Sequence, residues 1–180
     1  ADARGRITYL NATLADWRAG SASIATEELG FGIAIQPQGG GRIDLRGPAR
    51  ITGPLGAFAD ASEASMRRIL EVNVLGTFLS SQLAVRHWRR QGIAGSIVNL
   101  SSIAATLGAP GEYVDYAASK AAVETFTVGL AKELAATGIR VNAVSPGTTL
   151  TDIHASAGDP GRPQRVAARI PIGRPATAEE

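Results

Sequence analysis

At 180 residues, with 44% hydrophobic and 19% charged residues, the chain has the composition of a single globular domain that is long enough to bury a core. A formal net charge of +2 is too small to indicate a nucleic-acid-binding protein. The absence of cysteine excludes disulfide bonds and thiolate metal sites, and with no signal-like N-terminus and no apolar run of bilayer length it favours a cytoplasmic protein without a membrane partner.

A single long helix is predicted from about Ala61 to Arg90. Asn73 lies inside this pattern, where asparagine is unfavourable because its side chain competes for backbone groups. We expect Asn73 either to kink the helix and bind a water or to be a tolerated polar residue. The basic cluster at 86–90 fits the C-terminal end of the helix, where positive charge complements the helix dipole. Neither His87 nor His154 has a partner at ligand spacing, so we expect no metal site.

The apolar run Ser96–Leu100 predicts a buried strand of a parallel sheet, and it ends in Ser101 and Ser102. Reactive groups of open α/β sheets lie just beyond the carboxyl ends of the strands. The Ser102 hydroxyl is therefore a candidate to hydrogen-bond a substrate oxygen. The alternative is that both serines only form a turn or cap a helix.

Tyr116 and Lys120 lie one turn apart on a second predicted helix, from about Asp115 to Ala136. A free phenol has a pKa of about 10, and a neighbouring ammonium favours the phenolate and lowers that value. This pair is therefore a candidate for acid-base catalysis, and the alternative is an accidental pair on the helix surface. Tyr113 has no cation one turn on, so we expect it to serve packing or to face a substrate.

The run Ile139–Val144 predicts a second buried strand, adjacent and parallel to the first because a helix separates the two. Pro146 and Gly147 end it sharply. The backbone at Thr149 and the hydroxyl of Thr151 are then candidates to meet a ligand amide. The alternative is that Pro-Gly forms an ordinary turn.

These motifs together resemble the short-chain dehydrogenase/reductase family from about residue 51 to residue 180. Ser102, Tyr116 and Lys120 match the family's catalytic triad in order and context, and Asn73 in the sequence NVLGTF matches the asparagine that completes its tetrad. The step from Ser102 to Tyr116 is 116 − 102 = 14 residues, one longer than the commonest family spacing, and we place the extra residue in Gly111–Asp115. The resemblance extends to the nicotinamide-side loop through these residues: Pro146, Gly147, Thr149 and Thr151.

The resemblance implies a Rossmann-like, doubly wound parallel sheet in a single domain. It also implies an NAD- or NADP-dependent oxidoreductase that interconverts an alcohol, such as a sugar or another polyol, and a carbonyl. Tyr116 would transfer the proton, Ser102 would hold the substrate oxygen, and Lys120 would lower the Tyr116 pKa and bind the nicotinamide ribose. Asn73 would anchor a water that links Lys120 to solvent. Family members of this kind assemble as homodimers or homotetramers, and a small molecule rather than a nucleic acid is the expected partner.

Residues 1–50 do not fit the family pattern. The Thr-Gly-x-x-x-Gly-x-Gly turn that cradles the pyrophosphate is missing, and we interpret the glycines of Gly30–Ala34 as a chance echo of it. Arg42–Asp44 resembles the lead-in to the family's fourth strand, but the proline that follows does not suit a central strand. The Gly- and Pro-rich run Ala157–Gln164 is predicted to be a loop, which in the family closes over substrate.

We therefore expect a domain that is incomplete in its N-terminal half and at its C-terminal end, where the chain stops on the approach to a further helix and strand. Two hypotheses follow from this pattern. The chain is either part of a working oxidoreductase or an inactive relic that serves only as a fold and oligomerisation module. The intact Ser102, Tyr116 and Lys120 favour the enzyme, and the missing glycine-rich turn favours the relic.

Overall fold

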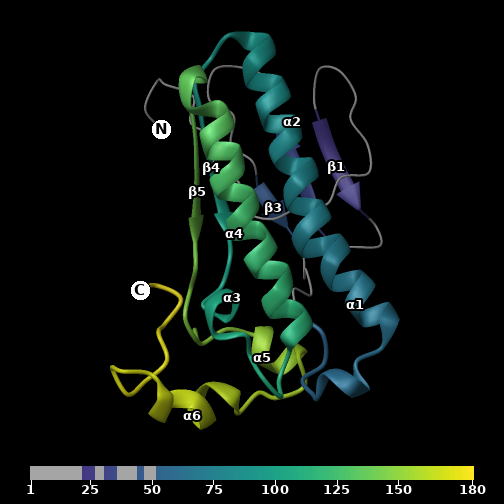
Figure 1. The fold of residues 1–180 in the computed structure, drawn as a ribbon, viewed down its shortest axis with the longest axis vertical. Coiled ribbons are helices and arrows are strands. Elements are labelled where there is room, and N and C mark those ends of the chain that lie inside the picture. Colours follow the sequence, from purple (N-terminus) through teal and green to yellow (C-terminus); the bar gives the residue numbers. More distant parts are fainter. Residues whose placement is uncertain (1–21, 27–30, 36–43, 47–51) are drawn as a thin grey trace.

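The computed structural model describes four parts of the chain: residues 22–26, 31–35, 44–46 and 52–180. The centre of the last part is a parallel pair of strands, β4 (Gly95–Leu100) and β5 (Ile139–Val144), joined by the long helix α4 (Val114–Leu134). Ser96 lies opposite Arg140 in this pair, so the prediction of adjacent parallel strands is confirmed. Parallel neighbours require a crossover, and α4 supplies it (Figure 1).

The predicted helix at 61–90 is present but is divided into three parts. They are α1 (Glu63–Leu70), a π-helical turn η2 (Glu71–Leu75) and α2 (Gly76–Gln91). Asn73 lies in the π-helical turn and is fully buried. Of the two alternatives for Asn73, the structure favours a local distortion of the helix, which takes the form of a π-bulge, a feature that is frequent at functional sites.

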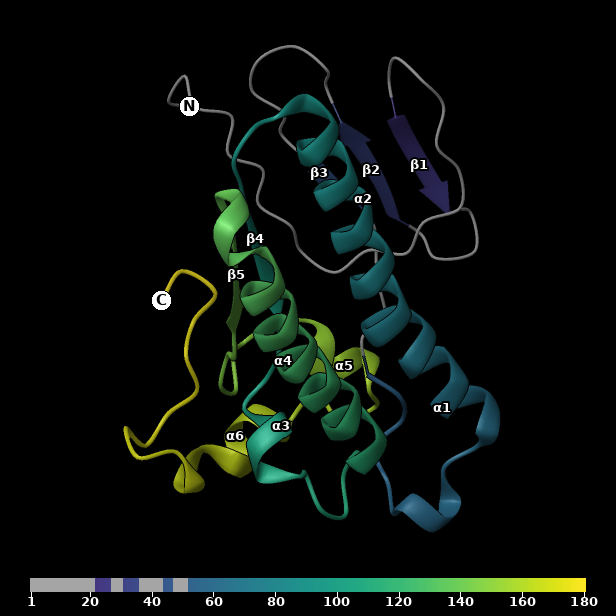
Figure 2. The same cartoon turned by 45° about the horizontal axis from the view of Figure 1, so that its top comes forward.

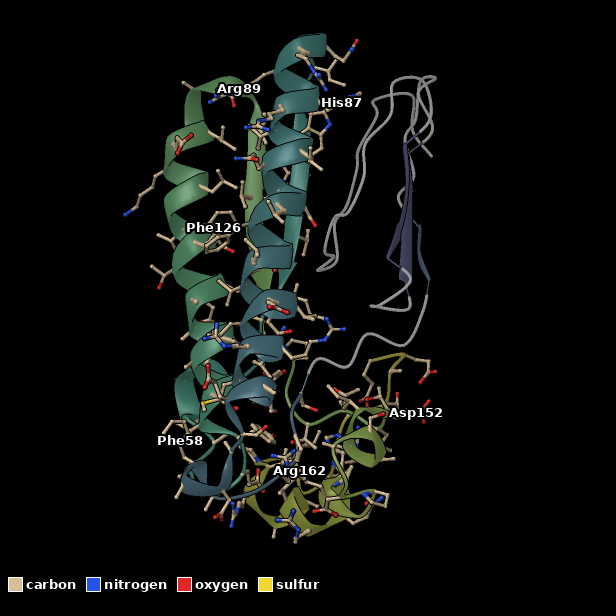
Figure 3. All side chains as sticks on the ribbon, turned by 90° about the vertical axis from the view of Figure 1, so that its right-hand side faces the viewer. Phe58, His87, Arg89, Phe126, Asp152 and Arg162 are labelled. Carbon is tan, nitrogen blue, oxygen red and sulfur yellow. The ribbon has the colours of Figure 1, made fainter. Side chains whose placement is uncertain are left out.

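The two long helices pack on the strand pair through one apolar cluster. In Figure 1, α4 runs in front of β4 and β5, and α2 lies beside it. Phe126 on α4, labelled in Figure 3, contacts Phe78 on α2 with 4.3 Å between the ring centroids. The buried members of the cluster come from both helices and both strands: Ala84, Val85, Trp88, Ile97, Leu134, Ile139 and Val141.

Burial along β5 differs from the sequence prediction. Ile139 and Val141 are buried, and Arg140 between them is exposed. The last three residues of the strand, 142–144, are all exposed, and Val144 is 50% exposed. The prediction of a strand buried throughout is therefore wrong for the second half of β5. The physical reason is that the apolar cluster covers only the first half of this strand.

Gly95, the first residue of β4, provides a stability prediction. A Cβ atom at this position would lie less than 3.0 Å from ring atoms of Trp88, which is itself fully buried. We expect Gly95→Ala to lower the free energy of unfolding by about 1–3 kcal/mol, because a packed core cannot move aside without strain. Gly129→Ala on α4 is the matched control, since nothing lies within 4 Å of its added methyl group.

The control should raise the stability by about 0.5–1 kcal/mol, because alanine favours a helix interior over glycine. Urea unfolding followed by circular dichroism measures both values. Equal stabilities for the two variants would show that Trp88 is not packed on Gly95 as described.

The N-terminal strands form a separate three-stranded antiparallel sheet in the order β1-β2-β3. Its members are β1 (Ala22–Thr26), β2 (Phe31–Ile35) and β3 (Asp44–Arg46). Asp44 is therefore the first residue of β3, which pairs with β2 and not with β4. This agrees with the sequence argument that the proline after this segment does not suit a central strand of the parallel sheet. Residues 31–34 of the glycine echo lie in β2, a strand, which agrees with its interpretation as a chance match. Gly30 and Arg42 lie outside the described residues.

Short helices gather where β4 and β5 end, next to the start of α4 (Figure 2). α3 (Ala104–Leu107) follows β4, and α5 (Ile153–Ser156) and α6 (Arg162–Val166) follow β5. The prediction of a loop through Gln164 is wrong for its last three residues, because Pro163 suits the first turn of a helix and α6 begins at Arg162. In the described part of the chain, no helix is long and apolar enough to cross a bilayer.

The remaining elements of the described chain are short 3₁₀ turns. They precede α1, follow α4 and follow α6: η1 (Phe58–Asp60), η3 (Ala135–Thr137) and η4 (Ala167–Arg169).

Candidate active site

Ser102 lies directly after β4 and makes two kinds of contact. Its hydroxyl oxygen accepts a hydrogen bond of 3.1 Å from the backbone N–H of Ala104, at the start of α3. It also lies close enough to the phenol of Tyr116 to oppose the rise in the pKa of that phenol. The structure therefore supports the interpretation of Ser102 as a residue that supports a helix start, and its role toward a substrate oxygen stays a prediction.

Ser101 lies on the other side of this turn and has a structural role. Its backbone N–H donates to the carbonyl of Val144 at 2.7 Å, which extends the pairing of the two strands. Its hydroxyl donates to a carboxylate oxygen of Glu124 at 2.8 Å, and Ser145, just after β5, donates to the same oxygen at 2.7 Å. Glu124 thereby ties the ends of both strands to α4.

Lys120 is buried without any exposed surface, one turn after Tyr116 on α4. Its ammonium donates to the carbonyl of Leu100, the last residue of β4, at 2.9 Å, and lies 5.6 Å from the centroid of the Tyr116 ring. Burial lowers the pKa of Lys120 to about 8. An ammonium has three donors, so this cation keeps further hydrogen-bonding capacity beside the phenol.

The pKa of Tyr116 differs from the sequence expectation. Burial raises this pKa, and the nearby Ser102 hydroxyl and the charge of Arg162 oppose the rise without cancelling it. The expectation that Lys120 lowers the Tyr116 pKa below its ordinary value is therefore wrong for the chain by itself. The reason is that the phenol loses hydration and that the Lys120 ammonium is directed to Leu100.

Asn73 is connected to the turn of α4 that carries Tyr116. Its side-chain amide donates to the hydroxyl of Ser119 at 2.9 Å, and Ser119 donates to the backbone carbonyl of Tyr116 at 2.7 Å. The backbone carbonyl of Asn73 accepts from the Thr77 hydroxyl at 2.7 Å. The π-helical turn thus positions Asn73 against α4, and Asn73, Tyr116 and Lys120 belong to one connected group.

The segment after β5 meets this group only in part. The carbonyl of Pro146 accepts from the backbone N–H of Ile103 at 3.0 Å, so Pro146 and Gly147 lie beside the turn that carries Ser102. Within the described chain, Thr149 contacts Gly147, His154 and Ala176 instead of Tyr116 or Lys120, and Thr151 is exposed.

Sequence reasoning missed a second group beside Tyr116. Tyr113 packs edge-on against Tyr116, with 5.2 Å between ring centroids and 86° between ring planes. The guanidinium carbon of Arg162 lies 5.0 Å from the centroid of the Tyr113 ring, and Arg162 pairs with Glu112 at 2.6 Å. Glu112 and Arg162 are 50 residues apart. The one available signal was the extra residue in Gly111–Asp115, which contains Glu112.

Comparison with known proteins connects this site to a family. The family model described as enoyl-(acyl carrier protein) reductase matches residues 45–180. The chain belongs to the short-chain dehydrogenase/reductase family. Its match covers β4, β5, the helices and the tetrad residues described above, and a Rossmann-like fold is therefore expected for the complete domain.

Individual members of this family show how much of a complete protein the chain represents. It is 53% identical over 117 residues to the uncharacterised oxidoreductase YgfF of Escherichia coli K12, covering 64% of this chain and 47% of that protein. It is 40% identical over 113 residues to glucose 1-dehydrogenase of Gluconobacter oxydans, covering 62% and 42%. A solved structure of ElxO with NADP bound has a TM-score of 0.63 at 29% identity, covering 73% and 53%. The chain spans about half the length of these relatives.

Proposed function

We propose that the protein carrying this chain is an NAD(P)-dependent oxidoreductase that interconverts an alcohol and a carbonyl, with Tyr116 as the acid-base group. One observation carries the proposal: the fully buried Lys120 ammonium lies 5.6 Å from the centroid of the Tyr116 ring, one turn further along α4. A sugar or another polyol is the proposed substrate class. The glucose 1-dehydrogenase of Gluconobacter oxydans supports that choice by its name.

The proton steps follow from the positions of these side chains. In carbonyl reduction the Tyr116 O–H donates its proton to the substrate oxygen, and in alcohol oxidation the phenolate accepts that proton. The Ser102 hydroxyl, which lies close enough to the phenol to affect its pKa, would orient the same oxygen. The positive charge of Lys120 stabilises the phenolate that forms. The bound nicotinamide cofactor supplies or takes up the hydride at the carbon atom.

The residues present fit the nicotinamide half of such a cofactor. Lys120 is a fully buried cation whose ammonium uses one of its three donors on Leu100. Two neighbouring ribose hydroxyls are acceptors of the kind that would satisfy the other donors. In contrast, the glycine-rich turn that would hold the pyrophosphate does not occur in the sequence. We therefore propose that Lys120 and Tyr116 hold the nicotinamide ribose, and that the loop at Pro146 and Gly147 lies beside the nicotinamide.

A fluorescence titration with NADH and NADPH tests this assignment. We expect Lys120→Met to weaken binding of the reduced dinucleotide by about tenfold or more, the size of one charge-assisted hydrogen bond. Lys132→Met is the control, because Lys132 is exposed at the far end of the same helix. Isolated adenine nucleotide should bind weakly, because the phosphate-cradling turn is missing.

Two outcomes would count against the proposal. Tight binding of AMP would indicate an unrecognised phosphate site and contradict the assignment of the nicotinamide half. A parent chain that binds neither dinucleotide and turns over no alcohol or sugar would favour the alternative, a catalytically inactive fold and oligomerisation module.

We also propose that the protein is a homodimer or a homotetramer. Large apolar side chains remain exposed on α1, the π-helical turn η2, α2 and α4: Leu70, Leu75, Phe78 and Val128. A second copy of the chain that packs on these helices would bury them. Sedimentation equilibrium should show a dimer or tetramer in the parent and dissociation in Leu75→Glu/Val128→Glu. A monomeric parent at high protein concentration would contradict this assembly.

A further inference from the structure

Arg162, the first residue of α6, is held in place near the candidate proton donor. Its side chain is only 11% exposed, and its Nε and Nη2 donate to one carboxylate oxygen of Glu112 at 3.0 and 2.6 Å. Glu112 is itself 16% exposed at the side chain and also accepts from Arg165 at 3.2 Å. An ion pair with so little exposure has a defined geometry, unlike a pair of solvated surface charges.

This ion pair joins two segments that are far apart in the chain. Glu112 immediately precedes Tyr113, the N-cap residue of α4, whereas Arg162 begins α6. Figure 3 shows Arg162 at the end of the molecule where α4 begins. The backbone supports the same junction, because Gly56 N–H donates to the carbonyl of Glu112 at 2.9 Å and Leu55 N–H donates to the carbonyl of Ala157 at 3.2 Å.

The guanidinium of Arg162 is linked to the Tyr116 ring by one intervening aromatic ring. It lies over the face of Tyr113 at 5.0 Å, within the range of a cation–π contact. Tyr113 in turn meets Tyr116 edge-on at 5.2 Å. The chain Glu112, Arg162, Tyr113 and Tyr116 is therefore a continuous contact path from the surface to the candidate proton donor.

We propose that Arg162, fixed by Glu112, is a positioning residue for the reaction: it orders Tyr113 against Tyr116 and supplies a second positive charge to the phenol. The inference rests on the proposed function for its consequence in catalysis, but the contacts that carry it do not. It assigns a role to an arginine on the segment that follows β5, outside the tetrad.

The electrostatics of the site agree with this arrangement. Burial raises the pKa of Tyr116, and the charge of Arg162 is among the factors that hold the rise back. Burial also raises the pKa of Tyr113 to about 12, where Arg162 and Arg165 act against the rise and Glu112 adds to it. Lys120 is the other cation beside Tyr116, on α4. Removing the charge at Arg162 should therefore move the Tyr116 titration to higher pH.

The test uses tyrosine labelled with ¹³C at the ζ carbon and followed by NMR as a function of pH. The sequence contains three tyrosines, so Tyr113→Phe and Tyr116→Phe assign the resonances. In Arg162→Met we expect the Tyr116 midpoint to rise by about one pH unit, the size typical of a nearby charge. Arg165→Met is the matched control: it also removes a partner of Glu112, but Arg165 is 52% exposed at the side chain and does not lie on the Tyr113 ring.

A charge swap separates the electrostatic role from simple docking of α6. Glu112→Arg combined with Arg162→Glu restores an ion pair but places a carboxylate on the Tyr113 ring. Amide hydrogen exchange at 153–169 should be faster in Arg162→Met by about tenfold, as for loss of a charged hydrogen bond, and close to the parent in the swap. The Tyr116 midpoint should nevertheless stay raised in the swap.

Three results would overturn the proposal. The first is an equal shift of the Tyr116 midpoint in Arg162→Met and Arg165→Met, and the second is no shift of this midpoint in Arg162→Met. The third is a charge swap in which the Tyr116 midpoint returns to the parent value. The swap decides the matter if Arg162→Met does not fold, as judged by circular dichroism. The titration needs neither cofactor nor substrate. A parent protein without turnover would therefore count against the proposed function, but it would not affect the conclusion about Arg162 and the Tyr116 titration.

Discussion

Tyr116→Phe is expected to lower the rate of carbonyl reduction by roughly 10²–10⁴-fold, the contribution of a positioned general acid, while the fold stays intact. Phenylalanine keeps the ring that packs edge-on against Tyr113 and contacts the buried Ala104 and Ala117. It loses the transferable proton. Nicotinamide absorbance with a panel of sugars and alcohols measures the rate, and circular dichroism reports the fold.

Tyr113→Phe is the control for this substitution, since Tyr113 is a neighbouring phenol on the same turn. It has no lysine one turn on, and burial raises its pKa to about 12, so its proton is poorly available at neutral pH. We expect a much smaller loss of rate than in Tyr116→Phe. A Tyr116→Phe protein with parental activity, or a larger loss in Tyr113→Phe, would show that the proton donor has been misassigned.

Lys120→Arg is expected to lower the rate by roughly a hundredfold although it keeps the positive charge, because a displacement of about 1 Å in an active site has effects of this size. Lys120 has no exposed surface and its ammonium lies 2.9 Å from the Leu100 carbonyl. A planar guanidinium is larger and directs its donors differently, so it cannot occupy this position without moving β4 or Tyr116. The same absorbance assay measures the loss.

Lys132→Arg controls for the change of cation, because Lys132 is exposed in the last turn of the same helix. Its activity should match the parent. Urea unfolding of Lys120→Arg should also show destabilisation by about 1–3 kcal/mol, as for overpacking of a core. If Lys120→Arg and Lys132→Arg behaved alike, the Lys120 ammonium would not be the specific partner of the tyrosine and the ribose.

The helices and strands that position the site were predictable because their signals are local. The apolar run at 96–100 and the Tyr116–Lys120 spacing each describe one element, and the crossover rule places the two strands side by side. The unfavourable position of Asn73 in a helix indicated the local distortion that η2 provides.

The features that were missed depend on contacts between distant residues. Glu112 and Arg162 form their ion pair across 50 residues, and neither residue carries a local pattern that indicates the other. The sign of the Tyr116 pKa change was also mispredicted, because the sequence shows the neighbouring lysine but not the burial of the phenol or the direction of the ammonium. The helical start of α6 was missed for a different reason. It has a local cause, Pro163 at a first-turn position, but it lies inside a Gly- and Pro-rich run that is otherwise typical of a loop.

Isotope tracing of the transferred hydrogen tests the central claim most directly. The protein is incubated with NADH or NADPH deuterated at the transferable position and with a panel of aldoses and ketoses, and the products are analysed by mass spectrometry. We expect an alcohol that carries one deuterium from the cofactor at the former carbonyl carbon, formed by the parent and not by Tyr116→Phe within the same time. A product without cofactor-derived deuterium, or equal labelling by the parent and Tyr116→Phe, would contradict the assignment of this site as a tyrosine-dependent oxidoreductase.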